Sequence, residues 1–203
     1  MPQLAPAGPV RRGSGLVVLD GSDSLTESLA PLLHDLGVRL EVGTTAADAV
    51  DLAVRAGDDE AVPDLVVLAG QAWVQPSRWA TWRSLGIPHL PIDWERRRVS
   101  VGPVVVPGSP CLGCLALHRY DVRRSGRGTL ARPDRNRPDG GDPVLATLGA
   151  GIAALLTRNL VLHRRYLPGL SLEVNLPDPH IVTRRWAPHP RCDGHIPQDR
   201  MAL

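Results

Sequence analysis

The stretch GLVVLDGSDSLTESLAPLLHDLGVRLEV, residues 15–42, decides the fold class. It begins with four aliphatic residues at 16–19, a run typical of a short buried strand. Leucines then recur at helical spacing, Ser24 and Glu27 form a predicted capping box, and a glycine follows the last leucine. Residues 38–42 predict a second strand. A strand, a helix and a strand in succession are typical of one unit of a parallel α/β sheet.

The same alternation continues to residue 93. We expect a helix, a strand, a helix and a short strand at residues 45–56, 64–69, 76–86 and 89–92. The strand at 64–69 is apolar after its first residue, which indicates burial on both faces of a sheet. Buried strands that alternate with helices predict a mostly parallel sheet, so residues 15–93 are predicted to be a Rossmann-like half of an α/β fold.

The pattern changes after residue 93, where we expect a β-rich C-terminal extension that is clamped by zinc. Its predicted elements are a hairpin bent at glycine and proline, a short helix, a crossover loop, a long helix and two strands, at residues 97–106, 115–120, 119–141, 143–165, 170–174 and 180–185. The long helix begins with an Asp-Pro pair and carries a face of small residues that allows close packing. We therefore predict a single domain at 15–196, whose second half is 94–196, between a flexible arm at 1–14 and a tail at 197–203.

Composition narrows the function classes. The chain has 203 residues, of which 43% are hydrophobic, enough for one globular core. No apolar run reaches the roughly 20 residues of a membrane span, and no secretory signal is visible, so we expect a soluble cytoplasmic protein without a membrane partner. All 23 basic residues are arginines, which excludes chemistry that needs a lysine.

The charge balance argues against nucleic acid as a partner. A formal charge of +2 is too small for a nucleic-acid interface over the whole protein. The segment 119–141 contains seven arginines that could contact phosphates, but it also contains three aspartates. A solvated loop is the simpler interpretation of this segment.

The three cysteines and a late histidine carry the strongest chemical signal. Two residues separate Cys111 from Cys114, and two separate Cys192 from His195. This spacing lets a tight turn present two ligands to one ion, and three thiolates with one imidazole complete a closed, structural zinc shell. Such a site would fasten the C-terminal tail to the rest of the domain. Two alternatives stay open: His189 as the fourth ligand, or a redox pair of Cys111 and Cys114 with Cys192 incidental.

The order of these features resembles the ThiF/MoeB superfamily, the fold of ubiquitin-activating-type adenylyltransferases. After the Rossmann-like half and the hairpin comes the segment Gly-Ser-Pro-Cys111-Leu-Gly-Cys114-Leu-Ala-Leu-His118-Arg-Tyr-Asp121. This segment looks like the ThiF-like cyclodehydratase partner proteins of azole-forming ribosomal peptide pathways, and the closing Trp-x-Pro-His-Pro-x-Cys192 fits the same branch. The resemblance covers roughly residues 15–196 and implies that zinc holds the architecture.

The sequence departs from the adenylating members of this superfamily at each catalytic element that can be compared. Those members bind ATP through a Gly-x-Gly-x-x-Gly turn after the first strand, whereas the turn here is Asp20-Gly-Ser-Asp23-Ser. Its carboxylates lie where phosphates would approach a helix N-terminus. The magnesium-binding aspartate after a middle strand is replaced by Ala69-Gly70-Gln71, and residues 119–141 hold no cysteine for a thioester. The resemblance therefore implies a scaffold without catalytic residues and without ATP as a cofactor.

Non-adenylating members of that branch bind the leader of a precursor peptide and present it to a YcaO-type cyclodehydratase, which itself uses ATP to form thiazolines or oxazolines. The resemblance implies both partners for this protein, and a homodimer. The 14 residues before the first strand do not encode the winged-helix peptide-binding module that the branch usually carries, so leader binding is expected on another surface or a separate protein. The alternatives are an active adenylyltransferase for a peptide or sulfur-carrier C-terminus, and a regulatory or structural homodimer unrelated to peptide modification.

Overall fold

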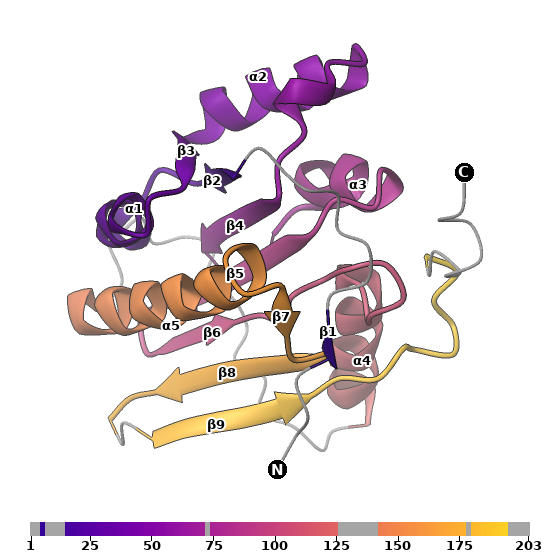
Figure 1. Ribbon diagram of the computed structural model, residues 1–203. Helices are drawn as coiled ribbons and strands as arrows, with labels where there is room; N and C mark the ends of the chain where they lie inside the picture. The colour runs from indigo at the N-terminus through magenta and orange to yellow at the C-terminus, as the bar shows by residue number, and fades with distance from the viewer. Residues whose placement is uncertain (1–4, 7–14, 72–73, 126–141, 178–179, 195–203) are drawn as a thin grey trace.

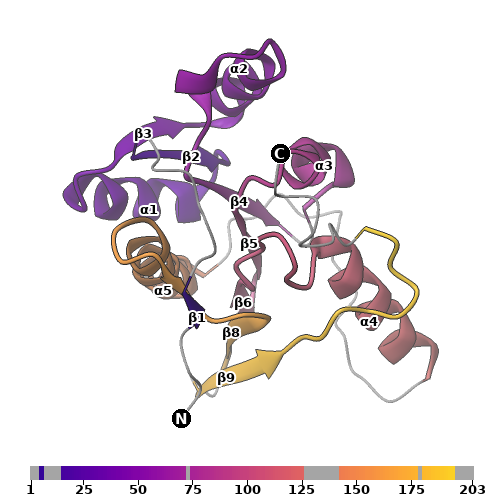
Figure 2. The ribbon, with the colours of Figure 1, turned by 45° about the vertical axis from the view of Figure 1, so that its right-hand side comes forward.

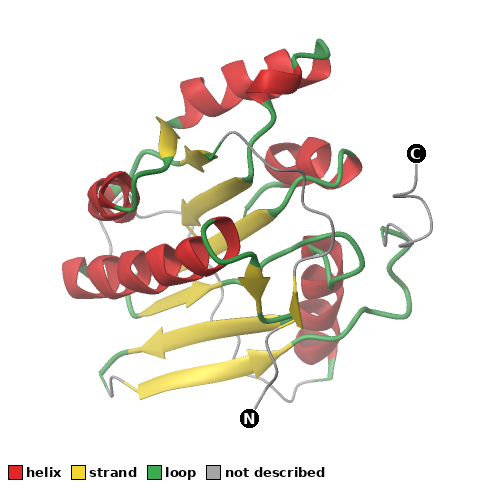
Figure 3. Ribbon diagram, viewed as in Figure 1, coloured by secondary structure: helices red, strands yellow, loops and turns green. Residues whose placement is uncertain are grey.

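The computed structural model describes residues 5–6, 15–71, 74–125, 142–177 and 180–194. At its centre lies a mixed seven-stranded sheet in the order β3-β2-β4-β5-β6-β8-β9, with helices on both faces (Figure 1, Figure 3). The strands of this sheet are β2 (Leu16–Asp20), β3 (Arg39–Val42), β4 (Leu65–Gln71), β5 (His89–Glu95), β6 (Arg98–Val101), β8 (Leu170–Asn175) and β9 (His180–Arg185). The helices are α1 (Ser24–Asp35), α2 (Thr44–Arg55), the short 3-10 helix η1 (Asp59–Ala61), α3 (Pro76–Ser84), α4 (Leu112–Arg124) and α5 (Pro143–Val161).

The first half of the chain confirms the α/β prediction. β2 pairs in parallel with β3 on one side and β4 on the other, and β4 pairs in parallel with β5. The N-cap of α1 is Asp23 instead of the predicted Ser24, because the Asp23 carboxylate accepts a hydrogen bond from the backbone N–H of Thr26 at 3.0 Å. This carboxylate therefore already occupies the N-terminus of α1.

The second half corrects two predictions. The sheet is mixed instead of mostly parallel, because β5, β6, β8 and β9 pair antiparallel in succession. The predicted hairpin at 97–106 is also wrong: β5 continues to Glu95, β6 returns from Arg98, and the chain turns at residues 96–97. The sequence pattern ended the predicted strand before Asp93, because a carboxylate inside an apolar run usually indicates the end of a strand. In the structure Asp93 is buried and β5 continues through it.

Two apolar clusters cover the two faces of the sheet. Alternate residues of β2 and β4 point to opposite faces, as the pleat requires. One cluster packs the leucines of α1 and the inner face of α5 on the sheet, and the other packs Trp79 and Trp82 of α3 with Leu112 and Leu115 of α4. Figure 2 shows α1 and α5 on one side of the sheet and α3 and α4 on the other.

The long helix α5 lies on its face of small residues, as its sequence allows. Ala146, Gly149, Ala150 and Ala153 are buried against the sheet and α1. A Cβ at Gly149 would come within 2.6 Å of Val99 Cγ2, so this glycine permits the close approach of α5 to β6. Asp142 caps the helix as predicted, but α5 ends at Val161, a few residues earlier than expected.

The predicted arm and crossover loop are only partly described. Within the arm, β1 (Ala5–Pro6) pairs antiparallel with β7 (Arg165–Tyr166) in a separate two-stranded sheet. The predicted short helix at 115–120 is longer in the structure, because α4 extends from Leu112 to Arg124 and takes in the start of the predicted loop. Residues 126–141 lie outside the described part of the chain, as do residues 195–203.

Candidate metal centre and the cleft at the strand ends

Three cysteine sulfurs lie together beside the N-terminus of α4. Cys111 is the N-cap residue of this helix, Cys114 lies in its first turn, and Cys192 comes from the tail after β9. The Cys111 sulfur is 3.8 Å from that of Cys114 and 3.6 Å from that of Cys192, and all three sulfurs lie within 4.8 Å of one another. A tetrahedral zinc with bonds of about 2.3 Å sets neighbouring sulfurs about 3.8 Å apart. The triad therefore has the dimensions of a zinc–thiolate site.

The local backbone makes room for this arrangement. A Cβ at Gly113 would lie 3.4 Å from the sulfurs of both Cys111 and Cys192, and a Cβ at Gly194 would clash with the Arg83 guanidinium. All three cysteines are free thiols. The sulfur of Cys192 lies as close to that of Cys111 as the sulfur of Cys114 does. This proximity favours a metal centre over a redox pair of Cys111 and Cys114.

The fourth predicted ligand, His195, lies outside the described residues, whereas the alternative His189 is described and engaged elsewhere. The Nδ1 atom of His189 accepts a hydrogen bond from the backbone N–H of Arg191 at 3.1 Å, so the proton resides on Nε2. That Nε2–H donates to the Asp121 carboxylate at 2.9 Å. Both ring nitrogens of His189 are therefore used, and its backbone N–H donates to the Cys114 sulfur at 3.3 Å. His189 thus contacts the cysteine triad through its backbone N–H, and neither of its ring nitrogens is turned to the three sulfurs.

Polar contacts that the sequence did not indicate hold the tail on β8 and α4. Trp186 donates its indole N–H to the Ser171 hydroxyl at 2.8 Å, and His118 donates from Nε2 to the carbonyl of Ala187 at 2.9 Å. Arg191 pairs with Asp121. The His118 and Asp121 side chains thus fasten the tail that carries Cys192.

Cys111 and Cys192 differ in how readily their thiols ionise. Burial disfavours the thiolate of Cys111, but hydrogen bonds from the backbone of Cys114 and contacts with the other sulfurs outweigh it and lower the pKa of Cys111. Burial raises the pKa of Cys192 to about 12, and the neighbouring sulfurs add to this rise. One negative charge in the triad opposes the next, so three thiolates together require a cation.

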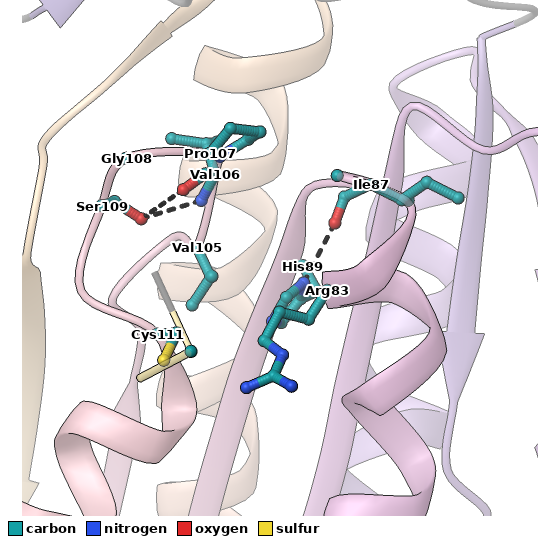
Figure 4. Close-up of a pocket in the computed structure, with 11 residues that line it drawn as sticks. Arg83, Ile87, His89, Val105, Val106, Pro107, Gly108, Ser109 and Cys111 are labelled. Atoms are coloured by element: carbon teal, nitrogen blue, oxygen red, sulfur yellow. Dashed lines mark hydrogen bonds between the residues drawn. The ribbon is translucent and has the colours of Figure 1, made fainter. Parts of the chain in front are cut away.

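A small cavity lies behind Cys111. It has a volume of about 20 Å³, enough for one water molecule, and is lined by residues that include Arg83, His89 and Ser109 (Figure 4). His89 is buried, its Nδ1–H donates to the carbonyl of Ile87 at 3.0 Å, and its Nε2 has no hydrogen-bond partner among the described residues. Burial, together with the charge of Arg83, lowers the pKa of His89 to about 4.

The neutral state of His89 predicts a loss of stability in mild acid. In the unfolded chain the imidazole binds a proton near pH 6.5, whereas the folded protein excludes that proton down to a pH of about 4. The unfolded state thus binds more protons within this window, and the free energy of unfolding should fall by about 3 kcal/mol as the pH drops through it. Urea unfolding followed by tryptophan fluorescence at several pH values measures the slope.

His89→Asn is the matched variant, because its amide can still donate to Ile87 but does not titrate. We expect its free energy of unfolding to change less between pH 6.5 and pH 4 than that of the wild type. Equal slopes for the two proteins would contradict the assignment of a buried neutral imidazole.

A larger cleft opens where the parallel strands end. It has a volume of about 360 Å³ and lies at the carboxyl ends of β2 and β4, between residues 20–23 and residues 68–78. The chain passes from β2 to β3 on one side of β2 and then to β4 on its other side. The cleft therefore lies at the topological switch point of the sheet. This position is where open α/β sheets bind their ligands.

The protein's own charges fill this cleft. Asp20 is buried and forms a two-pronged ion pair with Arg78, with distances of 2.8 Å and 2.7 Å, and Arg78 also pairs with Asp48. The two carboxylates hold the pKa of Arg78 above its usual value. Asp23 caps α1 and accepts a hydrogen bond from the Trp94 indole at 2.6 Å. The cation and the helix N-terminus that could bind a phosphate are therefore both occupied by carboxylates.

Gly21 keeps the turn after β2 tight. A Cβ at this position would lie 2.5 Å from Thr26 Oγ1 and 2.9 Å from Ala69 Cβ. The turn thus packs directly on the end of β4, where Ala69 and Gly70 present no carboxylate for a magnesium ion. The structure thus agrees with the sequence analysis both for the turn after β2 and for the end of β4.

The arrangement of strands, α4 and tail defines a fold shared with solved structures. The chain is similar to the heterocyclase TruD, with a TM-score of 0.63 and 16% identity, and to a heterocyclase in complex with substrate and cofactor, with a TM-score of 0.61 and 18% identity. It is also similar to E. coli MccB bound to AMPCPP and MccA, with a TM-score of 0.62 and 12% identity. The chain thus shares its overall fold with these heterocyclases and with MccB.

The matched regions differ in extent. The likeness covers about nine tenths of this chain in each case, but only 28% of TruD, 26% of the other heterocyclase and 67% of MccB. The chain therefore spans roughly a quarter of the length of these heterocyclases. No protein-family model matches the sequence, and a comparison with curated proteins finds no match.

Proposed function

We propose that this protein is a non-adenylating ThiF-like partner in the biosynthesis of azol(in)e-modified ribosomal peptides. The likeness to two heterocyclases and to MccB supports the general pathway. The observation that carries the proposal is the cleft at the strand ends, in which Asp20, Arg78 and Asp48 neutralise one another and Asp23 occupies the N-terminus of α1. A triphosphate would have to displace these pairs and lie among carboxylates.

In this proposal the metal centre is structural. Cys111, Cys114 and Cys192 would bind zinc with His195 as the fourth ligand, and bound zinc would supply a fixed tetrahedral crosslink without an open position for chemistry. The contacts of Trp186, His118 and Asp121 with the tail support this role, because they orient the segment that delivers Cys192.

The proposed partners are the leader of a precursor peptide and a YcaO-type cyclodehydratase, and the proposed compartment is the cytoplasm. The cyclodehydratase would activate the peptide with ATP, and this protein would position the peptide without consuming nucleotide. Nucleic acid is not among the proposed partners: Arg119, at the start of the predicted loop, forms an ion pair with the buried Asp93.

The first test is nucleotide chemistry. With ATP, Mg²⁺ and a candidate precursor peptide, we expect no ATP–pyrophosphate exchange and no heat of ATP binding. MccB, whose structure has been solved with ATP, is the positive control for binding. The physical reason is the carboxylate set of the cleft, because Arg78, the one cation among the described residues that line it, is already paired with Asp20 and Asp48. Exchange that is stimulated by the peptide would contradict the scaffold and favour an adenylyltransferase.

The second test is reconstitution. We expect the protein to raise the rate at which a YcaO-type enzyme removes water from cysteine or serine residues of its precursor peptide, followed by mass spectrometry. A peptide that lacks its leader should lose this stimulation. A YcaO-type enzyme that works equally well with and without the protein, over the accessible concentration range, would contradict the proposed pathway.

A further inference from the structure

The small cavity behind Cys111 has the composition of a water-binding site. Its volume of about 20 Å³ is enough for one water molecule, and its polar side chains come from Arg83, His89, Ser109 and Cys111 (Figure 4). The Ser109 hydroxyl is already used on the backbone of Val106, from which it accepts at 2.9 Å and to which it donates at 2.8 Å. Hydrogen bonding in the cavity therefore depends on Arg83, His89 and Cys111.

His89 supplies an unpaired acceptor in the wall of this cavity. The residue is 1% exposed, and its ring Nδ1 lies 3.0 Å from the carbonyl of Ile87. Because a carbonyl only accepts, Nδ1 carries the proton and Nε2 keeps a free lone pair. Nε2 is buried and has no hydrogen-bond partner among the described residues. A buried acceptor without a donor is costly, so this nitrogen calls for a donor small enough to enter the cavity.

Arg83 supplies donors and a positive charge at the same place. Its guanidinium lies over the Trp79 ring, 5.2 Å from the ring centroid, and within the described part of the chain it pairs with no carboxylate. A Cβ built at Gly194 would clash with Arg83 Nη1 and would lie 3.5 Å from the Cys192 sulfur. The guanidinium therefore lies beside the cysteine triad.

We propose that the cavity binds one internal water molecule, which accepts a hydrogen bond from the Arg83 guanidinium and donates its two protons to His89 Nε2 and the Cys111 sulfur. Three hydrogen bonds are typical of a buried water. Arg83 and His89 are then positioning residues, because they act on the metal through Cys111. This inference rests on the metal centre of the proposed function, and not on its peptide or its enzyme partner.

The charge of the metal centre favours the same arrangement. Three thiolates and one neutral imidazole around Zn²⁺ leave one net negative charge. Cys111 is 3% exposed, so part of that charge is buried where bulk water cannot solvate it. The unpaired Arg83 brings one positive charge, and the water connects the two. Hydrogen bonds of this kind fix the orientation of a metal ligand and typically alter metal affinity about 10- to 100-fold.

A high-resolution crystal structure of the intact zinc-bound protein tests the water directly. We expect one ordered water molecule within hydrogen-bond distance of the Arg83 guanidinium, His89 Nε2 and the Cys111 sulfur. A cavity that contains no water, or a direct hydrogen bond from Arg83 to His89 in its place, would overturn the proposal.

Val105→Ile tests the role of the water, because Val105 lines the cavity and the added methyl group would take the water's place. We expect its zinc affinity, measured in competition with a chelator, to fall about 10-fold. Val104→Ile is the matched control, since it adds the same group next door, in the apolar cluster on the opposite face of the sheet. It should bind zinc like the wild type. Unchanged zinc affinity in Val105→Ile would overturn the proposal.

Arg83→Met and Arg83→Lys separate the charged donor from the packing of the side chain. Methionine keeps an apolar stem on Trp79 but donates nothing, so zinc affinity should fall about 10- to 100-fold. Lysine keeps a charged donor and should retain most of the wild-type affinity. Equal zinc affinities of both variants and the wild type would overturn the water-mediated contact alone, whereas a wild type that binds no zinc would also contradict the proposed metal centre.

Discussion

Cys192→Ser is expected to release zinc and detach the tail from α4. Wild-type protein should contain one zinc per chain, and the variant much less than one, because two thiolates and one imidazole form an incomplete shell. The free energy of unfolding should fall by at least about 3 kcal/mol, since metal binding energy is folding energy at such a site. Metal analysis and limited proteolysis of residues 186–194 measure the two effects.

A chelator provides the internal control. It should destabilise the wild type strongly and Cys192→Ser hardly at all, because the variant has already lost the ion. His195→Ala should lower zinc affinity like a ligand variant, whereas His189→Gln should keep the zinc content and lose only the hydrogen bond to Asp121. One zinc retained in Cys192→Ser, or loss of zinc in His189→Gln alone, would contradict the ligand set.

Arg98→Met is expected to lower the free energy of unfolding by several kcal/mol, because Arg98 belongs to a buried group of charges. Arg98 lies between Asp93 at 3.1 Å, Glu95 at 3.4 Å and Glu173 at 3.8 Å, where β5, β6 and β8 meet. Methionine would fill similar space but leave two buried carboxylates short of a cation, although Arg119 and Arg184 remain. Breaking a buried ion pair from one side typically costs about 3–5 kcal/mol.

Arg55→Met is the matched control, because it removes the same side chain from the exposed i,i+4 pair of Arg55 with Asp51 on α2. Exposed pairs contribute about 0.2–1 kcal/mol, so this variant should unfold close to the wild type. Urea unfolding of both variants at neutral pH measures the difference. Equal losses for the two would show that the charges around Arg98 are screened like a surface pair.

The sequence predicted the parallel half of the fold well, because its signals are local. Four strands and three helices follow from apolar runs and helical spacing between residues 16 and 95, with small shifts at their ends. The antiparallel half was harder, since the apolar run of β5 contains Asp93. Only the tertiary partners Arg98 and Arg119 explain how that carboxylate is buried within a strand.

The candidate site shows the same division. The two-residue spacing correctly predicted that Cys111 and Cys114 lie together. Cys192 was assigned to the same site because its spacing from His195 repeats that of the first pair. The roles of His189, Trp186 and Asp121 depend on contacts with residues between 15 and 75 positions away. No local pattern signals these contacts. His89 was missed for the same reason, because its burial follows from how β5 packs beneath the loop that precedes α4.

The distance along the chain between the thiols has a consequence for biogenesis. Cys111 and Cys192 are 81 positions apart, so closing that loop in an unfolded polypeptide carries a larger entropic penalty than joining Cys111 to Cys114. The nearby pair can meet an ion early, but the third thiolate arrives only after β8 and β9 have been made and paired. In the proposed metal centre, full metal loading would therefore require that synthesis has passed the last strand, and a nascent or truncated polypeptide would hold an ion only weakly.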